Sequence, residues 1–335
     1  MAIRVAINGF GRIGRLVLRA IMEEDRKDLE VVAINDLAPA EVSAYLFAYD
    51  SVHGPFRGTC VLKGDMLQVN ETQIHILSQK DPAALPWKKL GIDVVMECSG
   101  IFTKKDEAQK HIDAGAKKVL ISAPSPDADK TIVYGVNQKV LTANDRVVSN
   151  ASCTTNCLAP VAAVLEEKIG IARGYMTTIH AYTGDQRLVD TAHKDLRRAR
   201  AGALSLIPTS TGAAKAVGLV LPALAGKLDG TAIRVPTPNV SLIDFTFDAR
   251  KKTDIHTINT EMEQASKASL RGILGITKLP LVSSDFNHSP YSSVFDCTQT
   301  QVIEGTFCRI LSWYDNEWGF ANRMSDVAVL MGSLG

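Results

Sequence analysis

The chain has 335 residues, with 37 Lys and Arg, 36 Asp and Glu, and a formal net charge of +1. Hydrophobic residues make up 46% of it and charged residues 22%, which excludes a disordered, collagenous or disulfide-scaffold protein. The balanced charge provides no global field to attract nucleic acid or an anionic membrane, so we expect neither as a partner. An anionic ligand must therefore be held by a local group of residues.

The first 150 residues alternate short apolar runs with helical patterns. The runs predict strands at 3–7, 29–34, 93–98, 117–122 and 147–149, and apolar repeats at helical spacing predict helices at 12–24 and 103–114. Most of the strand runs are apolar throughout, which is typical of a parallel sheet covered on both faces. The pattern predicts an α/β domain with a Rossmann-type, doubly wound parallel sheet.

After residue 150 the pattern changes. Helices are predicted at 152–168, 212–221, 253–268 and 317–331, and strand-like runs lie at 174–180, 231–248, 270–283 and 307–314. Longer strands with a few helices favour a mixed-sheet α+β domain. At ~150 residues per domain, the length also suggests roughly two domains, which we place at 1–150 and from 151 onward.

The six cysteines are scattered without a CxxC pair, and no Cys/His cluster has zinc-site spacing. We therefore expect reduced thiols and no bound metal. The N-terminus lacks the features of a signal peptide, and no apolar run reaches the ~20 residues of a membrane span. These features favour a cytoplasmic protein.

A GxGxxG motif formed by Gly9, Gly11 and Gly14 follows the first predicted strand and opens the first predicted helix. The glycines allow a tight turn, close approach of backbone to a pyrophosphate, and close packing of helix on strand. Asp36 lies at the end of the second strand, where it can accept hydrogen bonds from an adenosine ribose. The arrangement predicts dinucleotide binding; the alternative is a glycine-rich turn followed by an unrelated Asp.

Cys153 lies in the stretch SCTTN, at the start of a predicted helix. The N-terminal backbone N–H groups and the helix dipole stabilise a thiolate at such a position. The alternative is a buried structural cysteine beside a Ser/Thr cap, which is the interpretation we prefer for Cys157 one turn later. His180 ends a strand-like run and is a candidate base for Cys153, although spacing alone does not bring the two together.

Three further stretches could bind anions. Residues 194–200 carry four basic side chains, residues 209–215 open a helix with hydroxyls and a glycine, and Arg234 lies inside a strand. A helix start rich in hydroxyls and glycine can form an anion-binding nest. The alternatives are a solvated charged face and structural salt bridges.

The chain closely resembles phosphorylating glyceraldehyde-3-phosphate dehydrogenases. The resemblance covers essentially the whole chain. It is carried by INGFGRIGR (7–15), SNASCTTNCLAP (149–160), TTIHAYTGDQ (177–186), HKDLRRARA (193–201), PTSTGAAKAVGLVLP (208–222), RVPTPNVSLIDF (234–245) and WYDNEWGFANR (313–323).

The resemblance implies roles for individual residues. Cys153 would be the nucleophile and His180 the base. Substrate and inorganic phosphate would be held by Ser152, Thr154, Thr183, Arg198, Thr211, Gly212 and Arg234. NAD would be contacted by Arg12, Ile13, Asp36, Lys80, Ser122 and Asn316, beside the glycines of the GxGxxG turn. It also implies a cytoplasmic homotetramer. The C-terminal helix would pack back onto the nucleotide domain, so that 316–335 completes domain 1–150 and leaves 151–315 as the catalytic domain.

The implied reaction is the oxidation and phosphorylation of glyceraldehyde 3-phosphate to 1,3-bisphosphoglycerate, a step of glycolysis and gluconeogenesis. Alternatives are a dehydrogenase for erythrose 4-phosphate and a non-catalytic nucleotide-binding sensor. For the cofactor, Asp36 and the apolar Leu37 favour NAD. Thr191 and Ala192 stand where many NAD-specific members have Leu-Pro. Small residues at these positions leave room for the extra phosphate of NADP. We expect NAD with NADP as a secondary cofactor.

Overall fold

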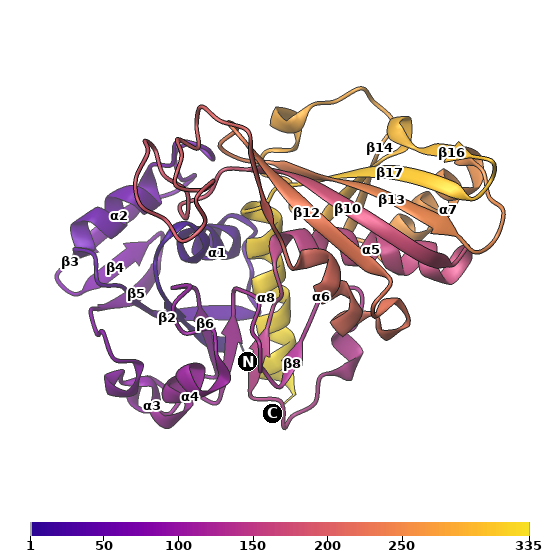
Figure 1. Ribbon diagram of the computed structural model, residues 1–335. Helices are drawn as coiled ribbons and strands as arrows, with labels where there is room; N and C mark the ends of the chain where they lie inside the picture. Colours follow the sequence, from indigo (N-terminus) through magenta and orange to yellow (C-terminus); the bar gives the residue numbers. More distant parts are fainter. Residues whose placement is uncertain (1, 335) are drawn as a thin grey trace. The chain divides into compact units, whose positions relative to one another are not determined.

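The computed structural model describes residues 2–334. Within that range the chain forms two compact units, each with its own sheet (Figure 1). Unit 1 contains the residues up to Ile132, Gln138–Ala151 and the residues from Ala321 onward. Unit 2 contains Val133–Asn137 and Ser152–Phe320.

Unit 1 is built around a sheet with the strand order β3-β4-β5-β2-β1-β6-β7-β9-β8. Its strands are β1 (Ile3–Asn8), β2 (Leu29–Asn35), β3 (Cys60–Lys63), β4 (Met66–Val69), β5 (Thr72–Leu77), β6 (Val94–Glu97), β7 (Lys118–Ile121), β8 (Lys130–Thr131) and β9 (Val147–Ser149). Its helices are α1 (Arg12–Glu23), α2 (Ala40–Ala48), α3 (Trp87–Leu90) and α4 (Lys105–Asp113), with short 3₁₀ turns at Pro82–Ala84 and Gln138–Val140.

The central strands of unit 1 run parallel, and β6 and β7 are buried along their whole length. Burial on both faces explains why their sequences are mostly apolar rather than alternating, with the charged residues Glu97 and Lys118 only at strand ends. The strand order reverses between β1 and β6, since β2 lies on one side of β1 and β6 on the other. In doubly wound sheets this switch point is where ligands bind, beyond the carboxyl ends of the strands.

The end of the chain belongs to unit 1. Residues 321–333 of this unit lie in helix α8 (Trp318–Ser333). Lys118 Nζ donates a hydrogen bond to the carbonyl oxygen of Met331 at 2.8 Å, and Arg26 pairs with Asp326 at 2.9 Å. A cation at the last turn of a helix interacts favourably with its dipole, so Lys118 stabilises the C-terminal end of α8.

Unit 2 contains a mixed sheet with the order β11-β12-β10-β13-β17-β15-β14, and β16 pairs with β17. Its strands are β10 (Ile171–Ala181), β11 (Ile207–Ser210), β12 (Leu228–Val235), β13 (Ser241–Ala249), β14 (Leu274–Thr277), β15 (Ser293–Asp296), β16 (Gln301–Ile303) and β17 (Phe307–Tyr314). Its helices are α5 (Cys153–Lys168), α6 (Ala213–Val220), α7 (Ile255–Lys267) and the start of α8, with 3₁₀ turns at Pro222–Leu224, Ser283–Phe286 and Cys297–Gln299.

Strand pairing and helix packing in unit 2 position the candidate site. β10 pairs in parallel with β12, so that His180 is the register partner of Arg234. β13 alternates buried and half-buried residues because one of its faces packs on the core. Helix α5 contacts β15 and β17 as well as α6 and α7, which explains why it is apolar on nearly every side.

Most predicted elements are confirmed within a few residues. The run 231–248 is wrong as a single strand: it forms β12 and β13, which flank β10 on opposite sides. Pro236 and Pro238 cannot continue a hydrogen-bonded ladder, and Val240 adopts a φ of 66°. The run 270–283 contains only β14, and Pro280 follows it. Helix α2 and strands β3–β5 were not predicted.

The glycines at the start of α1 make a prediction about stability. A Cβ at Gly14 would lie 2.1 Å from the carbonyl oxygen of Gly9, whereas a Cβ at Gly11 would meet nothing within 4 Å. Gly14→Ala should therefore destabilise the fold by about 1–3 kcal/mol, the usual cost of overpacking. Gly11→Ala, the matched control, should change the free energy of unfolding by less than about 1 kcal/mol. Denaturant unfolding of both variants tests this, and equal stabilities would contradict it.

Candidate active site

Cys153 is the first residue of α5, as predicted. Ser152 is the N-cap: its backbone is extended and its Oγ accepts a hydrogen bond from the N–H of Thr155 at 3.1 Å. Asn156 Nδ2 donates to the carbonyl oxygen of Ser152 at 3.0 Å and holds the turn from the other side. The cap fixes the first turn, whose N–H groups and dipole act on the Cys153 sulfur.

The structure brings His180 to this thiol. His180 lies near the end of β10, and its Nε2 is 3.6 Å from Cys153 Sγ. Its Nδ1 is 2.7 Å from the carbonyl oxygen of Ala181. A carbonyl oxygen can only accept, so Nδ1 carries the hydrogen and Nε2 presents its lone pair to the sulfur. Sequence spacing could not predict this contact.

Burial sets the protonation of the pair. It raises the pKa of Cys153, and the positive charge of Arg234 opposes that rise. It lowers the pKa of His180 to about 3, and Arg234 acts in the same direction. Burial thus disfavours the charged form of both groups, whereas Arg234 and the hydrogen bonds at the helix start favour the thiolate. His180 Nε2 presents the lone pair that can accept the proton of the thiol.

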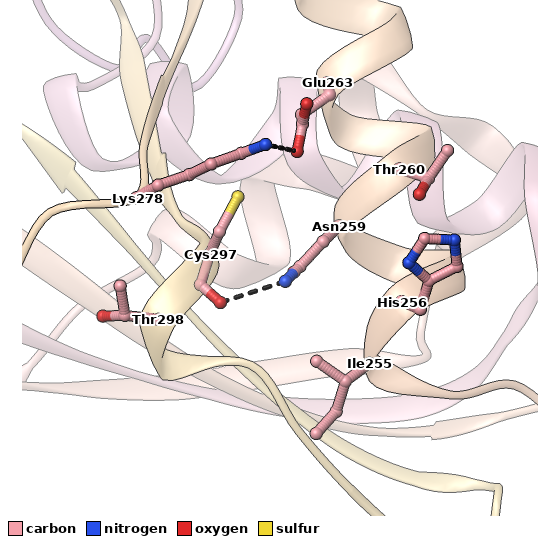
Figure 2. A pocket seen from close by; sticks show the side chains of 8 residues that line it. All are labelled: Ile255, His256, Asn259, Thr260, Glu263, Lys278, Cys297 and Thr298. Atoms are coloured by element: carbon pink, nitrogen blue, oxygen red, sulfur yellow. Dashed lines mark hydrogen bonds and ion pairs between the residues drawn. The ribbon is translucent and has the colours of Figure 1, made fainter.

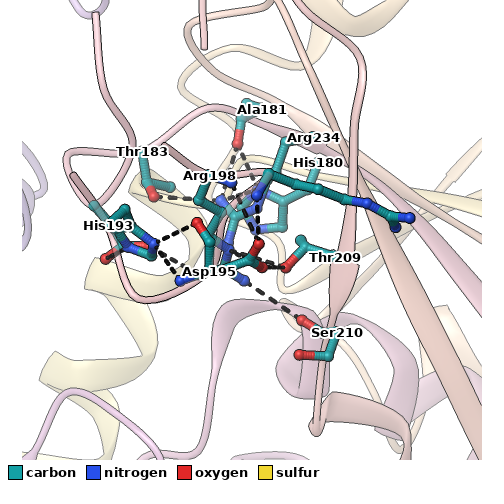
Figure 3. Close-up of polar contacts among 11 residues, drawn as sticks. His180, Ala181, Thr183, His193, Asp195, Arg198, Thr209, Ser210 and Arg234 are labelled. Carbon is teal, nitrogen blue, oxygen red and sulfur yellow. Dashed lines mark hydrogen bonds and ion pairs between the residues drawn. The ribbon is translucent and has the colours of Figure 1, made fainter. Parts of the chain in front are cut away.

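Arg234 contacts the same imidazole from β12. Its Nη1 lies 3.2 Å from His180 Nδ1, and donates to the carbonyl oxygen of Ala181 at 3.2 Å and to Thr183 Oγ1 at 3.3 Å (Figure 3). Arg234 thus lies directly beside the predicted base, and it contacts Thr183, a second predicted anion-binding residue. Burial is the main cause that lowers the pKa of Arg234, followed by the charge of Arg198.

Arg198 is held by a network of its own. Its Nη1 donates to Asp185 Oδ2 at 2.8 Å. Its Nε donates to Thr209 Oγ1 at 3.1 Å (Figure 3). Thr209 in turn donates to Asp195 Oδ2 at 2.5 Å. The charge of Arg198 also lowers the pKa of His180. Two guanidinium groups therefore act on one imidazole, which makes this side of the thiol a cationic region suited to phosphate oxygens.

The remaining predicted phosphate residues lie at two helix starts. Thr211 Oγ1 accepts from the N–H of Ala213 at 3.2 Å, and Gly212 is the N-cap of α6. Thr154 differs from expectation, because its hydroxyl is buried and 2.9 Å from Tyr314 OH rather than exposed to a ligand. Tyr314 was not predicted.

Tyr314 packs against His180 and hydrogen-bonds to Thr154, the residue after Cys153. Its hydroxyl bridges Thr154 and Thr178, at 2.9 Å from each, and its ring meets His180 edge-on with the centroids 5.9 Å apart. It is fully buried at the end of β17. The only sequence signal was its place at the end of a predicted strand, since aromatic residues there usually belong to the core.

Cys157 has the structural role that we expected. It is completely buried, and its Sγ lies 3.3 Å from Ser293 Oγ. Burial raises the pKa of Cys157 to about 12, so its thiol stays protonated.

Unit 1 contains a cavity of about 500 Å³ at the switch point of its sheet. It is lined by Asn8, Gly9, Gly11, Asn35, Asp36, Leu37, Gln79, Lys80, Cys98, Ser99, Ile101 and Phe102. A Cβ at Gly11 would meet open space, so a ligand can approach the backbone of this turn. Asp36 accepts from the N–H of Phe10 and, at 2.8 Å, from the N–H of Ala38. A glycine turn with an acidic residue beside it fits a dinucleotide.

The other predicted cofactor residues do not line this cavity. Arg12 pairs with Asp50 at 2.7 Å. Ile13 and Gly14 lie within α1, and Ser122 follows β7. Asn316 belongs to unit 2, where its Oδ1 accepts from Ser241 Oγ at 2.9 Å.

A separate cavity of about 670 Å³ lies in unit 2 beside α7 (Figure 2). Lys278 and Glu263 form an ion pair there at 2.6 Å, and Asn259 Nδ2 donates to the carbonyl oxygen of Cys297 at 3.0 Å. Burial raises the pKa of Cys297 to about 11. No sequence-predicted site residue lines this cavity, and we do not assign the active site to it.

Two protein-family models match the chain. The NAD-binding domain of glyceraldehyde 3-phosphate dehydrogenase matches residues 3–105, and its C-terminal domain matches residues 152–316. Curated proteins called glyceraldehyde-3-phosphate dehydrogenase are similar over their full length. The chain is 63% identical to one from Xanthobacter flavus, 62% to one from Cereibacter sphaeroides and 52% to one from Geobacillus stearothermophilus, with 100% of both chains covered in each case.

The chain belongs to the glyceraldehyde-3-phosphate dehydrogenase family. Membership of this family confirms the predicted fold class, a Rossmann-type NAD-binding domain with a mixed-sheet catalytic domain. It also confirms the prediction of an NAD-dependent dehydrogenase. None of the helices in residues 2–334 is long and apolar enough to cross a membrane.

The geometry of the thiol pair makes a prediction about reactivity. Iodoacetamide should alkylate Cys153 well before Cys157, because Cys157 is buried and hydrogen-bonded. His180→Asn should slow alkylation of Cys153 at pH 7 by about tenfold or more, since the base that accepts the thiol proton is lost. Peptide mass spectrometry over time measures both rates, with Cys157→Ser as the control that leaves the rate unchanged. Faster labelling of Cys157 would contradict the assignment.

Proposed function

We propose that the protein oxidises glyceraldehyde 3-phosphate to 1,3-bisphosphoglycerate through a thioester on Cys153, with NAD and inorganic phosphate as co-substrates. The observation that carries the proposal is the distance of 3.6 Å between Cys153 Sγ and His180 Nε2, at a helix start and beside Arg234. A sensor without turnover has no need of this pair. The comparisons do not favour erythrose 4-phosphate as the substrate.

The first step forms a bond between sulfur and carbon. His180 Nε2 accepts the thiol proton, and Cys153 Sγ attacks the aldehyde carbon, whose π electrons move to oxygen. The backbone N–H of Cys153, at the first turn of α5, can stabilise the developing oxyanion. His180 returns its proton to this oxygen, which completes a neutral hemithioacetal.

The second step oxidises the carbon. NAD, held by the residues of the unit 1 cavity, would supply the hydride acceptor. His180 accepts the hydroxyl proton as the C–H bond breaks, and the carbonyl forms again as a thioester. The contact of His180 Nε2 with Cys153 Sγ places this base beside the carbon bonded to the sulfur, within reach of the hydroxyl proton.

The third step transfers the acyl group. Arg234 and Arg198 provide charged hydrogen-bond donors, and Thr183, Thr211, Gly212 and Ser152 complete the proposed set for substrate phosphate and inorganic phosphate. Thr154 is left out of this set because its hydroxyl is buried against Tyr314. A phosphate oxygen attacks the thioester carbon, the C–S bond breaks, and the sulfur of Cys153 leaves with the electron pair. The sulfur takes back the proton held by His180, and the proton of the attacking phosphate passes to solvent. The ion pair of Arg198 with Asp185 supports this role because it holds the guanidinium in place.

For NAD, we propose that Gly9, Gly11, Asp36 and Lys80 bind in the cavity of unit 1. Arg12, Ile13, Gly14, Ser122 and Asn316 complete the proposed set on the basis of the family resemblance. Arg12 supports the turn through Asp50, a carboxyl group whose pKa is about 2. Burial of Asp50 acts to raise its pKa, but hydrogen bonds from backbone N–H groups and the charge of Arg12 together lower it by more.

We also propose a domain division, an assembly and a location. The NAD-binding domain would comprise 1–150 completed by 316–335, and the catalytic domain 151–315; the contacts of α8 residues within unit 1 support this division. The side chains of Leu188, Leu196, Leu204 and Leu206 are exposed, and covering them with further copies of the chain would remove apolar surface from water, which supports a homotetramer. All six cysteines are free, which supports a cytoplasmic location.

The function is tested by a spectrophotometric assay. NAD reduction with glyceraldehyde 3-phosphate should depend on added phosphate or arsenate and exceed the rate with erythrose 4-phosphate. Cys153→Ser should abolish turnover, because a hydroxyl ionises too weakly to be the nucleophile. Cys157→Ser should keep most of the activity. A higher rate with erythrose 4-phosphate, or turnover by Cys153→Ser, would refute the proposal.

The arginines make a separate prediction. Arg234→Leu and Arg198→Leu should each raise KM for phosphate or for the phosphorylated aldehyde by about tenfold or more, since each loses a charge-assisted hydrogen bond of about 1.5–3 kcal/mol. The Kd for NAD should change less than twofold. Arg173→Leu, which removes an exposed arginine paired with Asp248, is the matched control. An equal loss of NAD affinity would assign these arginines another role.

The carboxylate of Asp36 predicts a preference for NAD over NADP. We propose that NAD is preferred and that NADP is used measurably. The repulsion between the Asp36 carboxylate and the 2′-phosphate of NADP outweighs the room that the small residues Thr191 and Ala192 leave for that phosphate. Asp36→Ala should raise the ratio of kcat/KM for NADP over NAD several-fold. Asp36→Asn removes the charge but keeps an acceptor for the N–H of Phe10, and should raise the ratio as well. A wild-type preference for NADP would contradict this.

A further inference from the structure

Glu97 is a fully buried acidic residue that the reaction does not use. It ends β6 and is 1% exposed. Its Oε1 accepts hydrogen bonds from the backbone N–H of Ser99, at 2.8 Å, and from Ser99 Oγ. Its Oε2 contacts Asn8 Nδ2 and, at 2.9 Å, His111 Nε2. Four polar groups from three segments of unit 1 therefore converge on one carboxyl group.

The direction of each hydrogen bond follows from the neighbours. Trp87 Nε1 donates to His111 Nδ1 at 3.0 Å, so the ring hydrogen of His111 lies on Nε2 and points to Glu97. The N–H of Ile101 donates to Ser99 Oγ, which leaves the Ser99 hydroxyl hydrogen for Glu97.

The amide of Asn8 is oriented in the same way. Asn35 Nδ2 donates to Asn8 Oδ1 at 2.7 Å, and the Asn8 amide hydrogens therefore face Glu97. All four partners of Glu97 are donors, and this is the set of contacts that a carboxylate satisfies. An amide or a carboxylic acid in its place would bring a hydrogen against one of these donors.

The hydrogen-bond network of Glu97 lies beside the glycine turn that borders the cavity of unit 1. Asn8 and Glu97 are register partners on the parallel strands β1 and β6, between which the strand order reverses. Asn8 and Ser99 both line the cavity of unit 1. Between them lies Gly9, whose φ is 90° and where a Cβ would come within 2.5 Å of Ser99 Cα. Glu97 thus holds the chain on both sides of the glycine turn.

We propose that Glu97, oriented by His111 and Trp87, is a positioning residue for the pyrophosphate of the dinucleotide. It fixes Asn8 before the glycine turn and Ser99 against it, so that the backbone N–H groups of the turn keep the geometry that receives phosphate. The inference rests on the proposed NAD site in this cavity. It is independent of the chemistry at Cys153.

The test compares ligands with and without a pyrophosphate. In Glu97→Gln, the Kd for NAD and for ADP-ribose should both rise by about tenfold or more, because one buried donor loses its acceptor. The inhibition constant of adenosine, which has no phosphate, should change less than twofold. At saturating NAD, kcat and the alkylation rate of Cys153 should stay near the wild-type values. Glu71→Gln, the same substitution at an exposed turn of unit 1, is the matched control.

Two milder variants keep the test decisive if Glu97→Gln does not fold. Ser99→Ala removes one donor, and Trp87→Phe removes the N–H that orients His111. Each should weaken NAD and ADP-ribose binding about threefold to tenfold and leave adenosine unchanged. Unchanged NAD binding in the folded variants, or an equal loss for adenosine, would overturn the inference. Wild-type NAD binding without oxidation of glyceraldehyde 3-phosphate would instead refute the proposed function and leave the role of Glu97 standing.

Discussion

The contact between Cys153 and His180 is the constraint on which the candidate site in unit 2 depends. Partial removal from water disfavours both the thiolate and the imidazolium. Chemistry at the sulfur then needs a base already aimed at it and positive potential close by. The carbonyl oxygen of Ala181 fixes the imidazole tautomer, and Arg234 and the first turn of α5 provide the potential.

The same arginine connects two requirements of the proposed reaction. Its charge favours the thiolate and opposes protonation of His180, and a phosphate bound beside it would partly neutralise that charge. Binding of substrate phosphate would therefore make it easier for His180 to hold a proton. The Asp185 and Asp195 carboxylates balance Arg198 in the same region, which limits the cost of bringing two guanidinium groups near one imidazole.

One architectural principle operates in both units. Parallel neighbouring strands place their carboxyl ends at the same sheet edge, where side chains leave the packed core and can be polar. In unit 2 this brings His180 beside Arg234 across the β10–β12 pair. In unit 1 it brings Asn8 beside Glu97 across the β1–β6 pair. Each pair is buried enough to be ordered, and each ends at the site where a ligand is proposed to bind.

The sequence by itself determined the parts that depend on local patterns. The glycine turn, the cap at Ser152, the continuous apolar strands and the motifs around Cys153 and His180 all arise from residues close together in the chain, and family resemblance extended them to a function. Only the tertiary structure decided which distant residues meet. The pairing of β12 and β13 on opposite sides of β10, the hydroxyl of Tyr314 beneath His180, and the four donors around Glu97 join segments far apart in sequence. Such contacts depend on strand order and burial, which periodicity does not encode because it reports only which face of an element is buried.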